Sequence, residues 1–441
     1  DDGACPFVRK RILSQFRRRR AQCTCHPFTE YKVGYFAQLV QPANAVPLLV
    51  LEQSYHKYSF SMDEQYIIGY DAKRIVSNAT GLGSYGRTLI NALAPLVPQN
   101  KLLLYAPDSG NEALRTQIAQ TSNVAYTYPK KAKLRLQKDL WRAHGIVKDL
   151  QRDGVQLFHG LSGELPRGIR KAGIRSVVTI HDLIFLAHPE YYHWIDTKLY
   201  ARKFQRTCRE ADLIIAISER TKNDILRYSD FPAERIRLIY QSCGDYFATP
   251  VSAVTRSAVR EKYHLPTRYL LNVGTVEARK NLLLAVQALH YLPEELKLVV
   301  VGRHTAYTRR VEKYIAAHHL QHRVLFLRGI PNQELPAIYQ QAEVFVYPSY
   351  YEGFGIPIIE AIQSGLPVVA CTGSCLEEAG GRASLYVAPD DAEGMGRAIQ
   401  RLLIGAPERE ASIVASRAYV RRFENQNIAA KVLAVYNELL N

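Results

Sequence analysis

The chain has 441 residues, of which 47% are hydrophobic and 22% charged, a composition typical of a soluble globular protein with room for two domains. No apolar run approaches the ~20 residues that a membrane-spanning helix needs, and seven cysteines without paired spacing argue against a disulfide scaffold. The formal net charge of +16 makes nucleic acid a candidate partner, but we find no recognisable DNA- or RNA-binding motif. A basic surface also suits phosphate-rich ligands and anionic lipid headgroups, so we do not expect nucleic acid to be the partner.

The first 61 residues show no sustained helical or strand periodicity. The apolar run 45–51 is too short and lies too deep in the chain for a secretory signal. Met62, one of only two methionines, directly precedes the first predicted strand. We therefore expect residues 1–61 to be an unstructured extension and hypothesise that the natural product starts at Met62, which peptides from further upstream in native protein would contradict. The alternative is a genuine disordered basic arm.

From Met62 onward, apolar runs of strand length alternate with helical stretches, a pattern that predicts a doubly wound parallel sheet. The glycine-rich stretch 80–86 follows the first strand and leads into a helix, but it lacks the third glycine of the dinucleotide fingerprint at the right spacing. The predicted strands are 66–70, 102–105, 155–159, 176–180, 213–217 and 236–239.

The stretch 130–151 is rich in Lys and Arg, with Leu134, Leu136, Leu140 and Trp141 interleaved. Two interpretations stay open. It is either an ordinary surface helix with a solvated face or a basic helix that faces a membrane or a lipid-linked acceptor.

Two polar residues stand where predicted strands end. His181 follows the fourth strand and Ser218 follows the fifth. Ligands bind at the carboxyl ends of strands in such sheets, which makes both residues site candidates. A histidine that caps a strand is also often structural, so its position alone does not decide its role.

Residues 249–266 have low apolar content and no clear strand, which predicts an inter-domain connection. A second α/β series follows it. Its first strand ends in a turn that holds Arg279 and Lys280, two adjacent cations that suit a diphosphate, although they could be ordinary surface charge. The predicted strands are 269–273, 296–301, 324–327, 344–346, 368–370 and 385–387.

The most specific stretch is 347–361, where a buried strand passes through two glycines into a helix that starts near Pro357. Backbone N–H groups and the helix dipole favour an anion at such a turn. Glu352 and Glu360 frame it, with seven residues between them. Carboxylates beside an anion site can hold hydroxyl groups, and a nucleotide-sugar has both phosphates and hydroxyls.

This spacing, with Glu-Gly-Phe-Gly and the proline, resembles the E-x7-E signature of retaining glycosyltransferases of the GT-B fold in glycosyltransferase family 4 (group 1, mannosyltransferase-like). The resemblance covers about residues 66–440. It implies two Rossmann-like doubly wound domains that face each other across a cleft. The expected segments are the extension 1–61, an N-terminal acceptor-side domain 62–248, a linker 249–266, a C-terminal donor domain 267–423 and a helix 424–441 that crosses back to the first domain.

In that family the first glutamate contacts the donor sugar and the second the ribose, the histidine lies at the reacting centre and the lysine binds phosphate. Many members have Arg after the glycine of the phosphate strand, where this chain has Thr275, so one cationic contact is missing or is replaced by Arg279. The implied residues are His181, Glu352 and Lys280 (catalytic), Gly81, Gly83, Gly274, Thr275, Arg279, Lys280, Glu352, Gly353, Phe354, Gly355 and Glu360 (donor-binding), and Tyr85 and Ser218 (acceptor-side).

The resemblance implies a hexosyltransferase without metal or cofactor that moves a sugar, mannose as first expectation, from GDP-mannose or a UDP-sugar to a glycan or lipid-linked acceptor in bacterial polysaccharide or lipopolysaccharide biosynthesis. We expect a cytoplasmic location, with peripheral attachment to the inner face of the membrane left open. The alternatives are a GT-B phosphorylase or epimerase, and a non-catalytic basic binding protein on a decayed GT-B scaffold. Intact Glu352, Glu360, Lys280 and His181 argue against decay.

Overall fold

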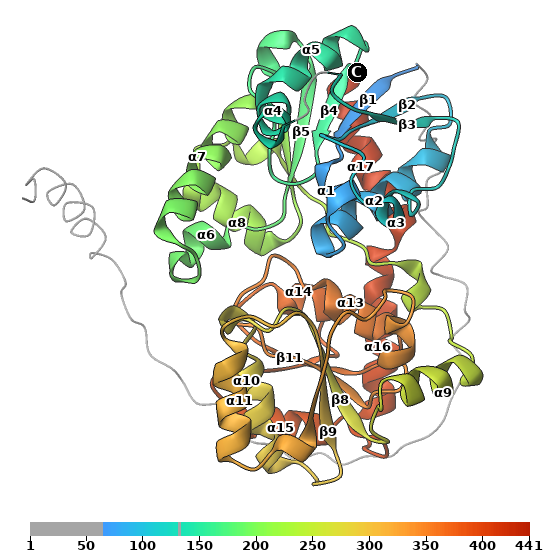
Figure 1. Ribbon diagram of the computed structural model, residues 1–441, viewed down its shortest axis with the longest axis vertical. Coiled ribbons are helices and arrows are strands. Elements are labelled where there is room, and N and C mark those ends of the chain that lie inside the picture. The colour runs from blue at the N-terminus through green and yellow to red at the C-terminus, as the bar shows by residue number, and fades with distance from the viewer. Residues whose placement is uncertain (1–64, 131–133) are drawn as a thin grey trace, which may run out of the picture. The chain divides into compact units, whose positions relative to one another are not determined.

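The computed structural model describes residues 65–130 and 134–441 (Figure 1). The expected extension 1–61 and its proposed start at Met62 lie outside the described residues. The described chain forms two separate parallel sheets, each with helices on both faces, which confirms the predicted α/β architecture.

The first sheet has seven strands in the order β3-β2-β1-β4-β5-β6-β7, and all of its pairings are parallel. Chain order reverses next to β1, so the carboxyl ends of β1 and β4 flank the switch point where such sheets bind ligands. The strands are β1 (Ile67–Asp71), β2 (Lys101–Tyr105), β3 (Val124–Thr127), β4 (Leu157–Gly160), β5 (Arg175–Ile180), β6 (Leu213–Ala216) and β7 (Ile236–Leu238).

The second sheet has six strands in the order β10-β9-β8-β11-β12-β13, again all parallel. Its switch point lies between β8 and β11, the strands that precede the turn with Lys280 and the loop with Glu352. The strands are β8 (Tyr269–Val273), β9 (Lys297–Val301), β10 (Val324–Leu327), β11 (Val344–Tyr347), β12 (Val368–Cys371) and β13 (Leu385–Val387).

The edge strand β3 was not predicted. Its residues Val-Ala-Tyr-Thr are all partly exposed, so they lack the continuous apolar run by which a buried parallel strand is read. The helices around the first sheet are α1 (Lys73–Ser77), α2 (Gly81–Leu93), α3 (Glu112–Arg115), α4 (Arg135–Leu140), α5 (Ile146–Arg152), α6 (Ile184–Ala187), α7 (Trp194–Glu210) and α8 (Glu219–Tyr228).

Two predicted loops are helical. The glycine stretch 80–86 forms the first turns of α2, because Thr80 is the N-cap and the amides of Gly83 and Ser84 bond to its carbonyl. The predicted linker holds a helix, and its Val259 is buried in the second core. The remaining helices are α9 (Ala253–Lys262), α10 (Leu282–Ala288), α11 (Thr308–Ala317), α12 (Leu335–Tyr339), α13 (Ile356–Gln363), α14 (Leu376–Gly380), α15 (Ala392–Gln400), α16 (Arg409–Val420) and α17 (Asn425–Leu440).

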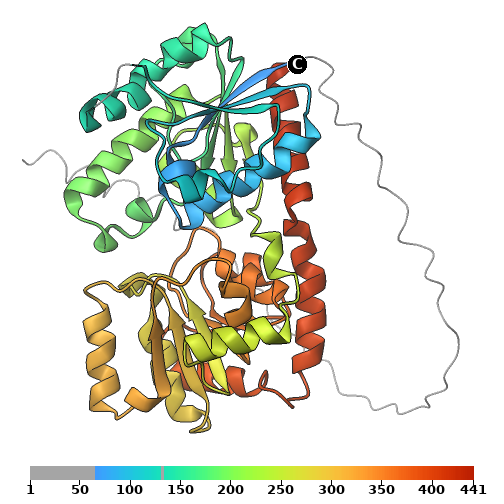
Figure 2. The same cartoon turned by 45° about the vertical axis from the view of Figure 1, so that its right-hand side comes forward.

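The last helix, α17, returns to the first sheet and packs beside α2 (Figure 2). Ile428, Val432 and Tyr436 are buried in the same core cluster as β1, β2 and α2. The Tyr436 hydroxyl lies 2.7 Å from Nδ1 of the buried His159. The end of the chain is therefore part of the first core rather than a tail on the second.

Candidate functional site

The loop between β11 and α13 carries the two glutamates. Gly355 has φ +129°, a conformation open to glycine, and α13 begins at the next residue with Pro357 in its first turn. The thiol of Cys375 contacts the backbone of this loop, because its Sγ lies 3.0 Å from the carbonyl oxygens of Glu352 and Phe354. The loop is thus held in one position by backbone geometry and by a buried contact.

Glu352 is the centre of an ion cluster. Its Oε1 accepts hydrogen bonds from Lys280 Nζ at 2.7 Å and from the Ser349 hydroxyl at 2.9 Å, and its Oε2 lies 2.7 Å from Arg279 Nη1. The hydroxyl of Tyr347 bonds to both Lys280 and Glu352. These residues come from the carboxyl ends of β8 and β11, which brings both cations and the carboxylate to one point.

The protonation states follow from this geometry. Burial alone would raise the pKa of Glu352, but Lys280 and Arg279 lower it to about 2. Burial would likewise lower the pKa of Lys280, and Glu352 raises it instead. At neutral pH Lys280 and Arg279 are therefore cationic and Glu352 is ionised, and the Glu277 carboxyl group also pairs with Arg279, with its Oε1 2.7 Å from Nη2.

Glu360 has a different environment, because no cation among the described residues pairs with it. Burial raises its pKa to about 7, although the Tyr339 hydroxyl donates to its Oε2 at 2.9 Å. Glu352 is thus fully ionised at neutral pH, whereas Glu360 titrates there. Of the two carboxylates, only Glu360 can change charge in the physiological range.

Both ring nitrogens of His181 are occupied. Nε2 lies 2.8 Å from the Leu161 carbonyl oxygen, which can only accept, so this nitrogen carries the proton. Nδ1 accepts from the side-chain amide of Gln241 at 2.6 Å. Burial lowers the His181 pKa to about 4, so the ring is neutral and has no free nitrogen in this arrangement.

Gly353 brings the loop between β11 and α13 into contact with the end of β5 in the first sheet. A Cβ added there would stand 2.1 Å from the His181 carbonyl oxygen, so only glycine allows this approach. The Gly353 carbonyl accepts from Ser218 Oγ at 2.7 Å. Close by, the Glu378 carboxylate accepts from the backbone N–H groups of Glu219 and Arg220 at the start of α8.

The two acceptor-side candidates are buried. Ser218 is 0% exposed, and its hydroxyl caps α8 and bonds to Gly353. Tyr85 is 6% exposed, bonds to Thr179 Oγ1 at 3.0 Å and packs edge-on against the His181 ring. Both side chains are therefore buried and hydrogen-bonded within the protein.

The other residues predicted to bind the donor are either glycines, which present only backbone atoms, or side chains buried in the core. Phe354 is 2% exposed and packs between Tyr240 and Phe423, so only its backbone can face a ligand. Gly274 has φ +150° and lies against the Lys280 side chain, beside Thr275. Gly81 and Gly83 lie in the first turn of α2, where a Cβ on Gly83 would collide with the Asn78 carbonyl.

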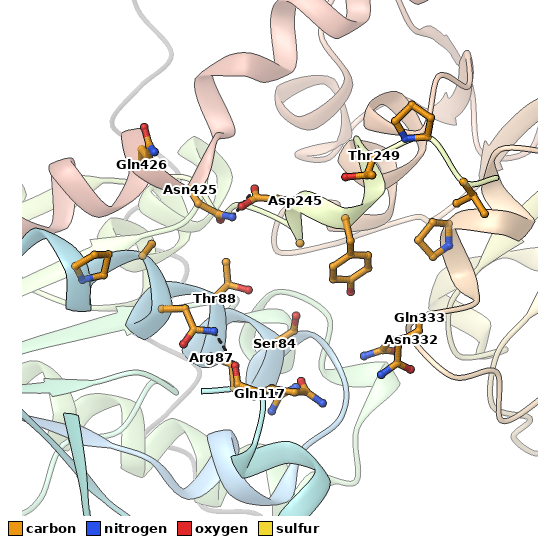
Figure 3. Close-up of a pocket in the computed structure, with 18 of the residues that line it drawn as sticks. Ser84, Arg87, Thr88, Gln117, Asp245, Thr249, Asn332, Gln333, Asn425 and Gln426 are labelled. Atoms are coloured by element: carbon orange, nitrogen blue, oxygen red, sulfur yellow. Dashed lines mark hydrogen bonds between the residues drawn. The ribbon is translucent and has the colours of Figure 1, made fainter. Parts of the chain in front are cut away.

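A cavity of about 950 Å³ lies beside the glycine turn of α2. Figure 3 shows Ser84, Arg87 and Thr88 of α2 on one side and Asn332 and Gln333 on the other. Most of its polar side chains are carboxamides or hydroxyls. Tyr246 also lines it, and burial together with the charge of Glu360 raises the pKa of this phenol to about 12.

Several site residues were not predicted from the sequence. Gln241 fixes the His181 ring, Ser349 and Tyr347 complete the Glu352 cluster, and Glu378 caps α8. The Tyr-Pro-Ser stretch at the end of β11 was a usable signal, because strand ends are where polar site residues gather. Gln241 likewise comes three residues after the end of β7, so the same signal was available for it. Within residues 65–130 and 134–441, no group of three or more His, Cys, Asp or Glu side chains could hold a metal ion.

Two doubly wound parallel sheets with contacts between their carboxyl edges define a GT-B-type glycosyltransferase. The family models agree with this class. The model described as Glycosyltransferase Family 4 matches residues 79–242, and that described as Glycosyl transferases group 1 matches residues 256–418. The chain belongs to this glycosyltransferase family.

Two relatives and one solved structure illustrate the similarity. O-antigen chain mannosyltransferase B of Escherichia coli is 28% identical over 82% of this chain and 96% of the relative. O-antigen chain mannosyltransferase RfbU of Salmonella typhimurium is 26% identical over 58% of this chain and 67% of the relative. The crystal structure of Anabaena HepE (Alr3699) in complex with UDP and glucose has a TM-score of 0.64 at 17% identity, covering 85% of this chain and 100% of that one. The similarity to the Anabaena structure shows that the two proteins share a fold.

Proposed function

We propose that this glycosyltransferase moves a mannose from GDP-mannose to a glycan or lipid-linked acceptor, with retention, in bacterial polysaccharide or lipopolysaccharide biosynthesis. The names of the two mannosyltransferase relatives support the sugar and the pathway. The observation that carries the proposal is the cluster of Lys280, Arg279 and Glu352 beside His181 and the Gly353 loop. A UDP-sugar is the alternative donor.

The cluster suits a departing nucleoside diphosphate. Loss of this group from the anomeric carbon leaves negative charge on the phosphates, and preorganised cations in a buried site stabilise such charge strongly. Glu352 forms ion pairs with both Lys280 and Arg279. We infer that the donor diphosphate competes for both cations, which frees Glu352 to accept hydrogen bonds from the sugar hydroxyls. The two cations supply the positive charge, so no metal ion is assigned a role.

His181 takes no part in proton transfer in this proposal, because both ring nitrogens are bonded. Its carbonyl oxygen lies against Gly353, so the residue positions the donor loop relative to the first sheet. The proposed acceptor hydroxyl attacks the face that the diphosphate leaves. Contact between the two sheets excludes water there and limits hydrolysis of the donor.

We assign the nucleoside half of the donor to Glu360 and to the cavity that Tyr246 lines. An ionised Glu360 accepts hydrogen bonds from ribose hydroxyls, and a cavity of about 950 Å³ is within the size range of small-molecule sites. Tyr246 offers a ring for stacking, and Asn332 and Gln333 offer amides for the edges of a base.

Donor binding tests this function through the pH dependence of Glu360. GDP-mannose has no phosphate that titrates near neutral pH, so we expect its affinity for the full chain to rise by about tenfold from pH 6 to pH 8, as Glu360 ionises near 7. Calorimetry would measure this. In Glu360→Gln the affinity should be low and independent of pH. Absence of binding by GDP-mannose and by UDP-sugars would overturn the proposed function.

We further propose that the protein associates peripherally with anionic membranes through α4. Leu134, Leu136 and Leu140 are 66%, 70% and 61% exposed, and Arg135 and Lys138 lie among them. Leucines next to cations suit the interface of an anionic bilayer. In the described part of the chain no helix is long and apolar enough to cross a membrane.

Vesicle sedimentation would test this surface. We expect Leu136→Ser with Leu140→Ser to lower binding to vesicles of phosphatidylcholine and phosphatidylglycerol by about a hundredfold or more, since each buried leucine contributes ~1.5–3 kcal/mol and ~1.4 kcal/mol is a factor of ten. Ile404→Ser is the matched control. Ile404 is exposed to a similar extent, 67%, but it lies in the domain that contains the second sheet. Equal binding by the α4 variant and the wild type would contradict the proposal.

A further inference from the structure

Arg87 of α2 is a buried cation with an unpaired edge. Its side chain lines the cavity of about 950 Å³ and is only 3% exposed (Figure 3). Its Nη1 donates to the carbonyl oxygens of Ile75 and Asn78, at 2.8 and 2.9 Å. Its Nε and Nη2 are buried and have no hydrogen-bond partner among the described residues. Buried N–H groups of this kind cost free energy unless an acceptor pairs with them, and a ligand in the cavity can supply one.

The backbone around Arg87 holds its guanidinium in one orientation. A Cβ on Gly83 would stand 2.8 Å from Arg87 Nη1 and 1.8 Å from the Asn78 carbonyl oxygen, so the glycine leaves the room that this group occupies. Burial lowers the pKa of Arg87, and the charges that oppose this effect belong to two tyrosines, not to a carboxylate. A guanidinium nevertheless stays protonated in a protein. The cavity wall therefore carries a fixed positive charge whose Nε–H and Nη2–H bonds are parallel.

Tyr339 connects the wall of this cavity to Glu360. Pro336 lines the cavity, and Tyr339 in the same helix, α12, donates its hydroxyl to Glu360 Oε2 at 2.9 Å. Tyr246 also lines the cavity, and the next residue, Phe247, packs edge-on against Tyr339 with ring centroids 5.3 Å apart. Two parts of the cavity wall thus meet at the residue that bonds to Glu360. A nucleoside whose ribose binds Glu360 can therefore place its base in this cavity.

The unpaired edge of Arg87 distinguishes between nucleobases. Two parallel N–H groups require two acceptors side by side. Guanine presents such a pair in O6 and N7, which an arginine fork binds in nucleic acids. Adenine has an amino group in place of O6, so it would turn another donor toward the guanidinium, and uracil has no second acceptor beside O4. Of these three bases, only guanine satisfies both N–H groups of Arg87.

Asp245 lines the same cavity and suits the opposite edge of guanine. Its Oδ1 accepts from the side-chain amide of Asn425 at 2.6 Å, and among the described residues its Oδ2 has no hydrogen bond. A carboxylate only accepts hydrogen bonds, and guanine carries N–H donors at N1 and N2, away from N7. The cavity therefore offers a pair of donors at Arg87 and an acceptor at Asp245, which is the complement of guanine.

We propose that Arg87 selects guanine, so that the donor is a guanosine diphosphate sugar and not a uridine diphosphate sugar. Its Nε and Nη2 donate to O6 and N7 of the base, and Asp245 accepts from the opposite edge. This assignment rests on the proposed function, which places the nucleoside in this cavity. Gly83 contributes through Arg87, because the absence of its side chain leaves room for the guanidinium.

Nucleotide binding to the full chain tests this selection. Calorimetry would measure the affinities for GDP, for UDP and for 7-deaza-GDP, in which a C–H group replaces N7. We expect the wild type to bind GDP about tenfold or more tightly than either of the other two nucleotides. In Arg87→Met the GDP affinity should fall by about tenfold or more, to within about threefold of the affinities for UDP and 7-deaza-GDP.

Arg323→Met is the matched control. Arg323 is also buried, at 2% exposed, but it donates to the carbonyl oxygens of Leu289 and Leu296 and does not line the cavity. Its loss should leave the ratio of GDP to UDP affinity unchanged. Inosine diphosphate, which lacks the N2 amino group, tests Asp245. It should bind more weakly than GDP to the wild type and equally to Asp245→Asn.

The comparison of nucleotides on the wild type decides the matter even where Arg87→Met does not fold, which circular dichroism would show. Binding of 7-deaza-GDP as tightly as GDP would overturn the proposal, and so would binding of UDP as tightly as GDP. A preference for GDP that persists in folded Arg87→Met would do the same. These results would leave sugar transfer itself untouched, since a UDP-sugar is the alternative donor. Failure of every nucleotide to bind would instead count against the proposed function.

Discussion

We expect Lys280→Ala to lower the rate of sugar transfer by about 10³-fold while the protein stays folded. Lys280 Nζ lies 2.7 Å from Glu352 Oε1 and is one of two cations at the point where the diphosphate is assigned. Its removal deletes a charge that is preorganised in a buried site and therefore acts more strongly on the transition state than on the free enzyme. Steady-state kinetics with the donor identified by calorimetry would measure the loss.

The fold should survive this substitution because Glu352 keeps a cationic partner. Arg279 Nη1 remains 2.7 Å from its other oxygen, and Ser349 still donates a hydrogen bond. The thermal midpoint should fall by only a few degrees. Lys262→Ala is the control, since Lys262 also pairs with a glutamate but is 54% exposed, and it should keep full activity. Turnover near wild type in Lys280→Ala would show that the diphosphate is bound elsewhere.

Sequence patterns predicted most of the fold because the strands are buried on both faces. Such strands, for example Val344–Tyr347, are continuous apolar runs that stand out from their surroundings. The exceptions have local causes. The edge strand Val124–Thr127 is partly exposed throughout, and α9 buries only Val259, so neither shows an apolar periodicity. The glycines at 81 and 83 indicated a loop, but Thr80 starts a helix there.

The site was predicted to the extent that it follows from strand ends. Both Lys280 and Glu352 were predicted to follow strand ends, and they meet because β8 and β11 are adjacent and parallel in the sheet, an adjacency that only the structure gives. Burial of individual side chains cannot be read in this way. Phe354 and Ser218 lie at the predicted positions, yet the first packs in the core and the second binds a backbone carbonyl. Gln241 comes from an irregular segment whose path only the tertiary structure defines.

The structure also bears on the role of the histidine. A strand-end histidine is commonly considered as a base, but the neutral His181 ring donates to Leu161 and accepts from Gln241. His181 contacts the loop between β11 and α13 through its backbone carbonyl, which lies against Gly353. In the proposed function, the alignment of the donor with the first sheet therefore depends on the contact between the backbones of His181 and Gly353.

Gly353→Ala is the substitution that tests this contact, and we expect it to lower transfer by about 10²-fold or more. The added Cβ would stand 2.1 Å from the His181 carbonyl oxygen, which belongs to the fixed end of β5, so the loop must move away. Displacement of reacting groups by about 1 Å costs a rate factor of this size. The hydrogen bond from Ser218 to the Gly353 carbonyl would lengthen at the same time.

The loss should appear in transfer rather than in nucleotide binding. Lys280 and Glu360 lie outside the contact, so GDP affinity should stay within about threefold of wild type. The backbone of Gly353 has no positive φ, and strain in the loop itself is therefore not a cause. Gly145→Ala is the control, because an added Cβ there meets Trp141 at an ordinary 3.4 Å and should leave activity unchanged. Transfer by Gly353→Ala within twofold of wild type would mean that catalysis does not need the loop to approach His181, and the assignment of the reacting centre to this point would fall.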